Sequence, residues 1–380
     1  MATLALLSAA LLSSCALAPV AEPSAAHSPP AARVTVALAQ APSPAVDHEV
    51  PALQSAPQAA PPEQTPHEFD KTAALRTWVE QQRRIYEVAA PLLIKNTELC
   101  PRHARQVLGF TAKNMFSYSD AFIDAARSAL GLGDELQIMT VLPGSGAEQA
   151  GLRKGDALLA VEIEPVPAGP NAESAAAELI GSEMRSRTSL HLVIRRDGQR
   201  IAVDVPLTPA CAMAIDLGNT AEPIALADGH RVMVTRGMLD FVQSDEELAY
   251  VLAREIARNE TMTTYRAETR DLIDHLHAID AGATSGGFPA DVLDAARSYA
   301  SDVDADTAKL ALYMLARAGF GIEGFQAFWQ HLAMGATDGG SGGRGDTVPA
   351  QPPVALRLSA LEQAIRDVES KMASGLPLVP

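Results

Sequence analysis

The chain has 380 residues, of which 47% are hydrophobic and 20% charged, so it can bury two or three domain cores and is not disordered throughout. Its 46 Asp and Glu residues outnumber 30 Lys and Arg residues, and a net charge of −16 would repel phosphate backbones, which excludes nucleic acid as a partner. No apolar run reaches the roughly 18–20 residues that span a bilayer, which excludes integral membrane enzymes.

The first 15 residues are typical of a segment that is removed by processing. Residues 2–14 are almost all Ala, Leu and Ser, as in the apolar part of a signal peptide. They lead into Leu12-Ser13-Ser14-Cys15, which resembles the bacterial lipobox. The resemblance implies a mature chain that begins at a lipidated Cys15, and the alternative is an ordinary secretory signal with a chance cysteine. By resemblance to enterobacterial lipoproteins, alanine at the next position implies an anchor in the outer membrane, facing the periplasm.

A proline-rich stretch and a helical segment follow. Residues 16–67 hold 11 prolines in 52 positions, mixed with Ala, Ser and Gln, so they predict an extended, disordered tether. Residues 68–105 are predicted to be a helical segment, because apolar side chains recur at helical spacing from Leu75 to Ala89.

Residues 106–207 carry glycines in an order that resembles a PDZ domain. Leu108, Gly109 and Phe110 come first, then residues 143–147 (Pro-Gly-Ser-Gly-Ala) and 151–156 (Gly-Leu-Arg-Lys-Gly-Asp). Glycine is expected at these places because a turn or a close strand approach excludes a Cβ atom. The resemblance implies that the amides near Gly109 and Phe110 hold a peptide carboxylate and that the next strand pairs with an extended peptide. The alternatives are a structural brace without a ligand and a groove covered by residues 111–135.

Two cysteines flank this module. In an oxidising compartment Cys100 and Cys211 could form a disulfide that closes a long loop and contributes about 3–5 kcal/mol in the chain-entropy model. Two free, buried thiols are the alternative.

The most informative stretch begins at Arg231. Residues 231–235 predict a short strand, and Ser244 with Glu247 forms a capping box that opens a helix over residues 245–259. The order of these segments resembles the HExxH zinc metallopeptidases of the CAAX-prenyl-endopeptidase type, in their soluble periplasmic branch. The resemblance covers about residues 212–370. It implies an α+β protein with a mainly helical, zincin-like metallopeptidase domain and a small β-rich PDZ-like domain.

The zinc motif of that family is degenerate in this chain. In a helical HExxH motif, two histidines one turn apart bind Zn²⁺ and the glutamate acts as general base. Here the histidine positions hold Arg254 and Arg258, which have no lone pair to donate, and only Glu255 is kept as a vestigial base. The position of the family's third ligand is Asp304, one methylene shorter than the usual glutamate. We therefore expect no cofactor. His275 and His277, two residues apart on a helix, cannot both chelate from one face and are expected on the surface.

The arginines suggest a substitute for the metal. Two guanidiniums carry the charge of one Zn²⁺, so we expect Arg254 and Arg258 to form a salt-bridge cluster with Glu255 and Asp304 that joins two helices. The alternative is that both arginines point to solvent and Glu255 with Arg258 is an ordinary helix pair.

Three functions remain open. The residues favour an inactive peptidase homologue of the cell envelope that binds extended polypeptides or an envelope protein, attached to the membrane through the lipid on Cys15. The first alternative is an active metalloendopeptidase with an atypical site, which would still use zinc. The second alternative is a structural scaffold with its grooves filled.

Overall fold

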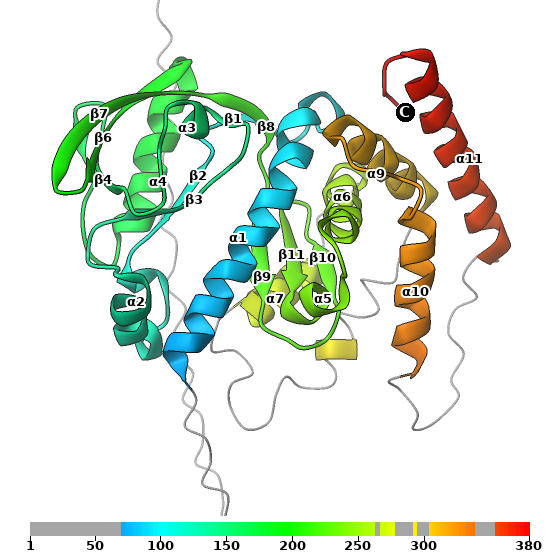
Figure 1. The fold of residues 1–380 in the computed structure, drawn as a ribbon, viewed down its shortest axis with the longest axis horizontal. Helices are drawn as coiled ribbons and strands as arrows, with labels where there is room; N and C mark the ends of the chain where they lie inside the picture. Colours follow the sequence, from blue (N-terminus) through cyan, green and yellow to red (C-terminus); the bar gives the residue numbers. More distant parts are fainter. Residues whose placement is uncertain (1–69, 263–266, 278–291, 295–303, 339–353) are drawn as a thin grey trace, which may run out of the picture. The chain divides into compact units, whose positions relative to one another are not determined.

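The computed structural model describes residues 70–262, 267–277, 292–294, 304–338 and 354–380. They form a mixed structure of helices and sheets, which confirms the α+β fold class (Figure 1). The predicted signal peptide, Cys15 and the tether up to residue 67 lie outside the described residues. No helix within the described part is both long and apolar enough to cross a membrane.

The first described helix, α1 (Lys71–Lys95), contacts elements from both the β-rich and the mainly helical parts of the described chain. It begins at Asp70, whose carboxylate accepts hydrogen bonds from the amides of Thr72 at 2.9 Å and Ala73 at 3.0 Å. It ends at the buried Asn96, whose side chain donates to the carbonyl oxygens of Leu92 and Met314, each at 2.9 Å. The helix is therefore shorter than the predicted segment 68–105, which continues into a 3₁₀ turn and a strand.

A β-rich module follows α1 in the chain. Its six-stranded sheet has the order β2-β3-β4-β6-β7, with β5 paired to β4. Buried apolar side chains from several of these strands, such as Ile138, Leu158 and Ile194, form its core with Ala172 and Ala176 of helix α4. The elements are β2 (Phe110–Lys113), β3 (Gln137–Val141), α3 (Gly146–Gln149), β4 (Ala157–Val161), β5 (Glu164–Pro165), α4 (Ala172–Glu183), β6 (Ser189–Arg196) and β7 (Gln199–Pro206).

The segment between β2 and β3 packs on α1. It contains α2 (Ile123–Leu130), and its buried Phe122 shares a small core with Leu75 and Val79 of α1 and with Met139 of β3. The inserted residues 111–135 are therefore anchored on the N-terminal half of α1.

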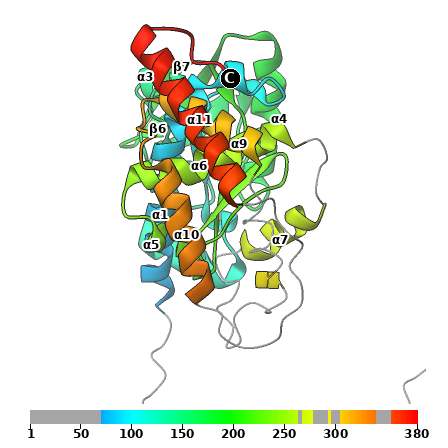
Figure 2. The same ribbon diagram turned by 90° about the vertical axis from the view of Figure 1, so that its right-hand side faces the viewer.

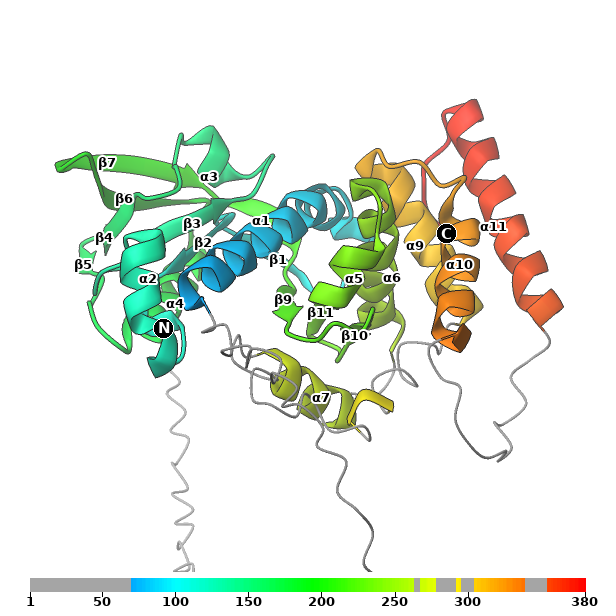
Figure 3. The same cartoon turned by 60° about the horizontal axis from the view of Figure 1, so that its bottom comes forward.

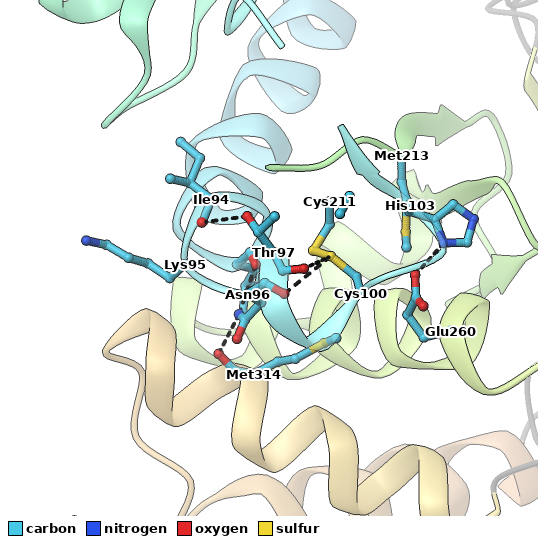
Figure 4. The surroundings of a disulfide bond; sticks show 12 residues. Ile94, Lys95, Asn96, Thr97, Cys100, His103, Cys211, Met213, Glu260 and Met314 are labelled. Atoms are coloured by element: carbon cyan, nitrogen blue, oxygen red, sulfur yellow. Dashed lines mark hydrogen bonds and ion pairs between the residues drawn. A yellow bond between two sulfur atoms is a disulfide. The ribbon is translucent and has the colours of Figure 1, made fainter. Parts of the chain in front are cut away.

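One two-stranded ribbon brings the chain into and out of the β-rich module. Strand β1 (Ala104–Val107) pairs antiparallel with β8 (Thr208–Cys211), so the boundary predicted at residue 106 falls inside a strand. Cys100 and Cys211 are joined by a disulfide beside this ribbon, with their Cα atoms 5.8 Å apart (Figure 4). Both cysteines are buried in the main core, where α1 meets β8.

The rest of the described chain is mainly helical. A three-stranded sheet of order β10-β11-β9 packs with α1, α6 and α9 around the largest core. Figure 2 shows α11 beside α9, and Figure 3 shows α7 below β9 and β10. The elements are β9 (Ala214–Gly218), β10 (Ala225–Ala227), β11 (Arg231–Thr235), α5 (Arg236–Phe241), α6 (Asp245–Thr261), α7 (Ala267–His277), α9 (Ala305–Ala318), α10 (Phe325–Asp338) and α11 (Val354–Ser374).

Candidate functional site

Helix α6 presents its candidate residues to the inside of the protein. It begins after Ser244, whose hydroxyl accepts from the amide of Glu247 at 3.1 Å, as the sequence predicted. The Glu247 carboxylate reaches back to the amide of Gln243 at 2.6 Å, one residue earlier than in the usual capping box. Most of the helix from Leu248 to Asn259 is buried, since α1, α9 and the small sheet pack around it.

Arg254 and Glu255 form a buried ion pair. The Arg254 side chain donates from Nε at 2.7 Å and from Nη2 at 2.6 Å to Oε1 of Glu255. Arg254 is 2% exposed and Glu255 is 0% exposed. The Arg254 guanidinium also lies over the ring of Trp329, with Cζ 3.8 Å from the ring centroid. Burial lowers the pKa of Arg254 to about 10, still well above neutrality, so the guanidinium stays charged at pH 7.

Arg258 completes an arrangement of two guanidiniums around one carboxylate. Its Nε lies 3.7 Å from Oε2 of Glu255, within ion-pair distance but beyond a hydrogen bond, and its side chain is 12% exposed. Both arginines therefore point into the protein rather than into solvent. The structure shows the Glu255 part of the expected cluster.

Asp304 has a different role from the one expected in the salt-bridge cluster. Asp304 is the N-terminal cap of α9, where its carboxylate accepts from the amide of Thr307 at 2.7 Å and from the Thr307 hydroxyl at 2.6 Å. Among the described residues, no ion pair joins Asp304 to either arginine. The short side chain meets the unpaired amides of its own helix first, which is why it caps α9 instead of bridging to α6. The two helices are linked there by a 2.7 Å hydrogen bond between the hydroxyls of Thr261 and Thr307.

The residues at this place do not fit a zinc ion. The guanidiniums have no lone pair, and the Glu255 carboxylate already faces Arg254 with one oxygen and Arg258 with the other. Within the described ranges, no group of three or more His, Cys, Asp or Glu residues could hold a metal ion. His275 and His277 are exposed on α7. These residues thus do not supply the set of His, Cys, Asp or Glu ligands that a tetrahedral zinc site requires.

Sequence reasoning missed the polar residues that hold the neighbouring turn. Asn259, directly after Arg258, accepts from the amide of Gly229 at 2.7 Å and donates to the carbonyl of Arg231 at 3.1 Å. The buried His103 contacts Glu260 through Nδ1 (Figure 4). Its Nε2 lies 2.8 Å from the carbonyl oxygen of Gly229. The signal in the sequence that could have found these contacts was the presence of polar residues among the apolar residues of α6. The partners of those residues lie far from α6 in the sequence.

The second candidate site is the loop before β2. Gly109 has φ +89°, and a Cβ atom added to it would lie 2.1 Å from the Cβ of Ser145, so glycine is required here. Its carbonyl accepts from the amide of Leu142 at 2.8 Å and from the Ser145 hydroxyl at 3.2 Å. Among the hydrogen bonds of the described residues, the Gly109 amide donates to no acceptor.

A cavity of about 300 Å³ opens beside this loop. The residues predicted to bind a peptide, Gly109 and Phe110, lie together in its wall. Ile180 of α4 and Met184, which follows that helix, also line the cavity, together with residues of α1. Strand β2 is at the edge of its sheet, since β3 is its single neighbour in the order. The other residues that line the cavity are Tyr86, Leu93, Ile94, Val107, Leu108, Thr111, Leu142, Ala210, Cys211, Ala212, Met213 and Ala214.

Comparisons with known proteins add little. No protein-family model matches the chain, and no curated protein is significantly similar to it. A crystal structure of the HtrA3 PDZ domain bound to a phage-derived ligand (FGRWV) is similar to part of the chain, with 14% identity and a TM-score of 0.21. The similarity covers 28% of this chain and 88% of that chain. A TM-score this low supports no conclusion about fold or function.

Proposed function

We propose that this protein is a catalytically inactive relative of the HExxH zinc metallopeptidases that binds extended polypeptides in the bacterial cell envelope. The order of motifs between residues 212 and 370 supports the peptidase ancestry, and the lipobox-like end at Cys15 supports a lipid anchor in the outer membrane. The polypeptide binds in the cavity beside β2, in a module that resembles a PDZ domain. Its terminal carboxylate meets the loop at Gly109.

The observation that carries the binding function is the open edge of β2 next to a cavity. An extended peptide can add to a free sheet edge through main-chain hydrogen bonds, while pockets beside the edge select side chains. The Gly109 amide, which donates to no acceptor among the described residues, is available to a carboxylate at the end of the strand. Apolar Ile180 and Met184 then suit an apolar last side chain.

The buried Glu255 supports the loss of catalysis. A general base must come within hydrogen-bond reach of the water or substrate proton that it removes. Glu255 is 0% exposed, and both of its carboxylate oxygens face guanidiniums. Water without a bound metal also ionises about nine pKa units less readily than water on a catalytic zinc.

Peptide binding tests the proposal directly. We expect fluorescein-labelled pentapeptides with an apolar last residue to bind the full-length chain, and their C-terminal amides to bind at least about tenfold more weakly, because the amide lacks the charge that the Gly109 loop holds. Fluorescence anisotropy measures both dissociation constants.

A matched pair of variants locates the site. Ile180→Glu places a charge in the cavity wall and is expected to abolish binding, whereas Ala177→Glu on the exposed side of the same helix leaves it unchanged. Equal binding of acid and amide peptides, or full binding by the Ile180 variant, would contradict the proposed site.

A further inference from the structure

A second cavity, of about 380 Å³, continues the first along β2. Tyr86 and Thr111 line both cavities, so the two adjoin, and we refer to them together as the groove beside β2. Lys113 at the far end of β2 lines the second cavity. At about 3.3 Å per residue, it lies roughly 13 Å along the strand from the Gly109 loop. A peptide whose carboxylate meets Gly109 therefore runs antiparallel to β2, with its fourth and fifth residues from the end at the second cavity.

A half-buried carboxylate lies in the wall of this second cavity. Asp216 is in β9, where its neighbours Ile215 and Leu217 are fully buried in the main core and the alternation of the strand turns Asp216 to the other face. Its side chain is 16% exposed. Its one ion-pair partner among the described residues is His277, with Nδ1 3.8 Å from Oδ1, and no hydrogen bond to the carboxylate is found there. Burial raises the pKa of Asp216, and the positive charges of His277, Arg231 and Lys113 act in the opposite direction.

The other lining groups favour a cation over an anion. Lys113 and Glu173, which both line the cavity, form an ion pair at 2.6 Å and offset each other's charge. Tyr86 and Tyr118 add aromatic rings, and burial raises the pKa of both phenols, which therefore stay neutral. His277 adds positive charge only when it is protonated. A carboxylate beside aromatic rings is a combination that binds guanidinium and ammonium groups.

We propose that this second cavity selects a basic side chain, arginine or lysine, four or five residues before the C-terminal carboxylate of the bound polypeptide. The proposal rests on the proposed function, because it assumes that a peptide lies along β2. It adds a specificity-determining residue, Asp216, that belongs to a different sheet from the strand that pairs with the peptide.

The test compares arginine with citrulline, its neutral isostere, at the fourth and at the fifth position from the end of otherwise identical labelled octapeptides with a free carboxylate. We expect the full-length chain to bind the arginine peptide about tenfold more tightly at one of these positions, the effect of one charge-assisted contact. In Asp216→Asn this preference should disappear, while the citrulline peptide binds as it does to the wild type. Asp240→Asn, an exposed aspartate on α5, is the matched control and should keep the preference.

The outcomes separate this inference from the function on which it rests. Because burial disfavours the charge on Asp216, its replacement by asparagine should not unfold the protein, and an unchanged thermal midpoint verifies this. If the peptides bind but arginine and citrulline are equal, or if Asp216→Asn keeps the preference, the basic-residue inference is wrong and the peptide groove stands. If no peptide binds through its carboxylate, the proposed function fails and the inference fails with it.

Discussion

Replacing Glu255 with glutamine is expected to lower the free energy of unfolding by about 3–5 kcal/mol at pH 7. The substitution keeps the size of the side chain but removes the carboxylate charge that faces both Arg254 and Arg258. The side chains of Arg254 and Arg258 are 3% and 12% exposed, so water replaces little of the interaction that they lose with the carboxylate. Removing the carboxylate of a buried ion pair is among the largest effects that one substitution can have. Urea denaturation of both proteins measures the difference.

Two further variants show whether this effect is specific. Glu369→Gln, at an exposed position on α11, should change stability by less than about 0.5 kcal/mol. Asp304→Ala should cost about 1 kcal/mol, the usual effect of losing a helix cap, because Asp304 caps α9. A loss at Asp304 as large as the loss at Glu255 would mean that Asp304 belongs to the cluster after all. A Glu255 variant as stable as the wild type would contradict the buried ion pair.

Removing the disulfide is the second change with a large expected effect. The bond between Cys100 and Cys211 spans 111 residues and encloses the whole β-rich module. In the chain-entropy model, a cross-link over a loop of this length stabilises by about 4–5 kcal/mol, because it restricts the unfolded chain. We therefore expect the double variant Cys100→Ala with Cys211→Ala to lose about 3–5 kcal/mol, measured by urea denaturation without reductant.

Reductant provides the control for the cysteine pair. Dithiothreitol should destabilise the wild type toward the double variant and leave the double variant unchanged. Cys15→Ser should keep the full stability of the folded part, because Cys15 lies outside the disulfide. A wild type that is equally stable with and without reductant, under conditions in which thiol titration shows reduction, would refute the contribution assigned to this bond.

Features that depend on neighbouring residues could be predicted from the sequence. Helix α6 begins after Ser244 and strand β11 ends at Thr235, because a helix cap and a short apolar run are local patterns. Gly109 has the positive φ that its place in a tight loop suggested. The pairing of Cys100 with Cys211 could be proposed because they flank one module.

Features that depend on distant contacts could not be predicted. Asp304 was expected to reach the arginines, but which acceptor its carboxylate meets depends on the first turn of α9. Nothing in the sequence places Trp329 over Arg254, since 75 positions along the chain separate them. Nothing in the sequence marks Asp216, and its place in the cavity wall follows only from the packing of α1 and β2 near it.

Zinc content shows whether α6 holds the Arg254–Glu255 salt bridge in place of the metal that HExxH peptidases bind on the helix that α6 resembles. The purified full-length chain, equilibrated with zinc and then dialysed, should contain less than about a tenth of an equivalent by elemental analysis, because its donor set lacks two ligands. The double variant Arg254→His with Arg258→His serves as comparison, and zinc in this variant alone would show that the two arginines account for the difference. About one equivalent of zinc in the wild type would contradict the account, and the active metalloendopeptidase with an atypical site would then be the better interpretation.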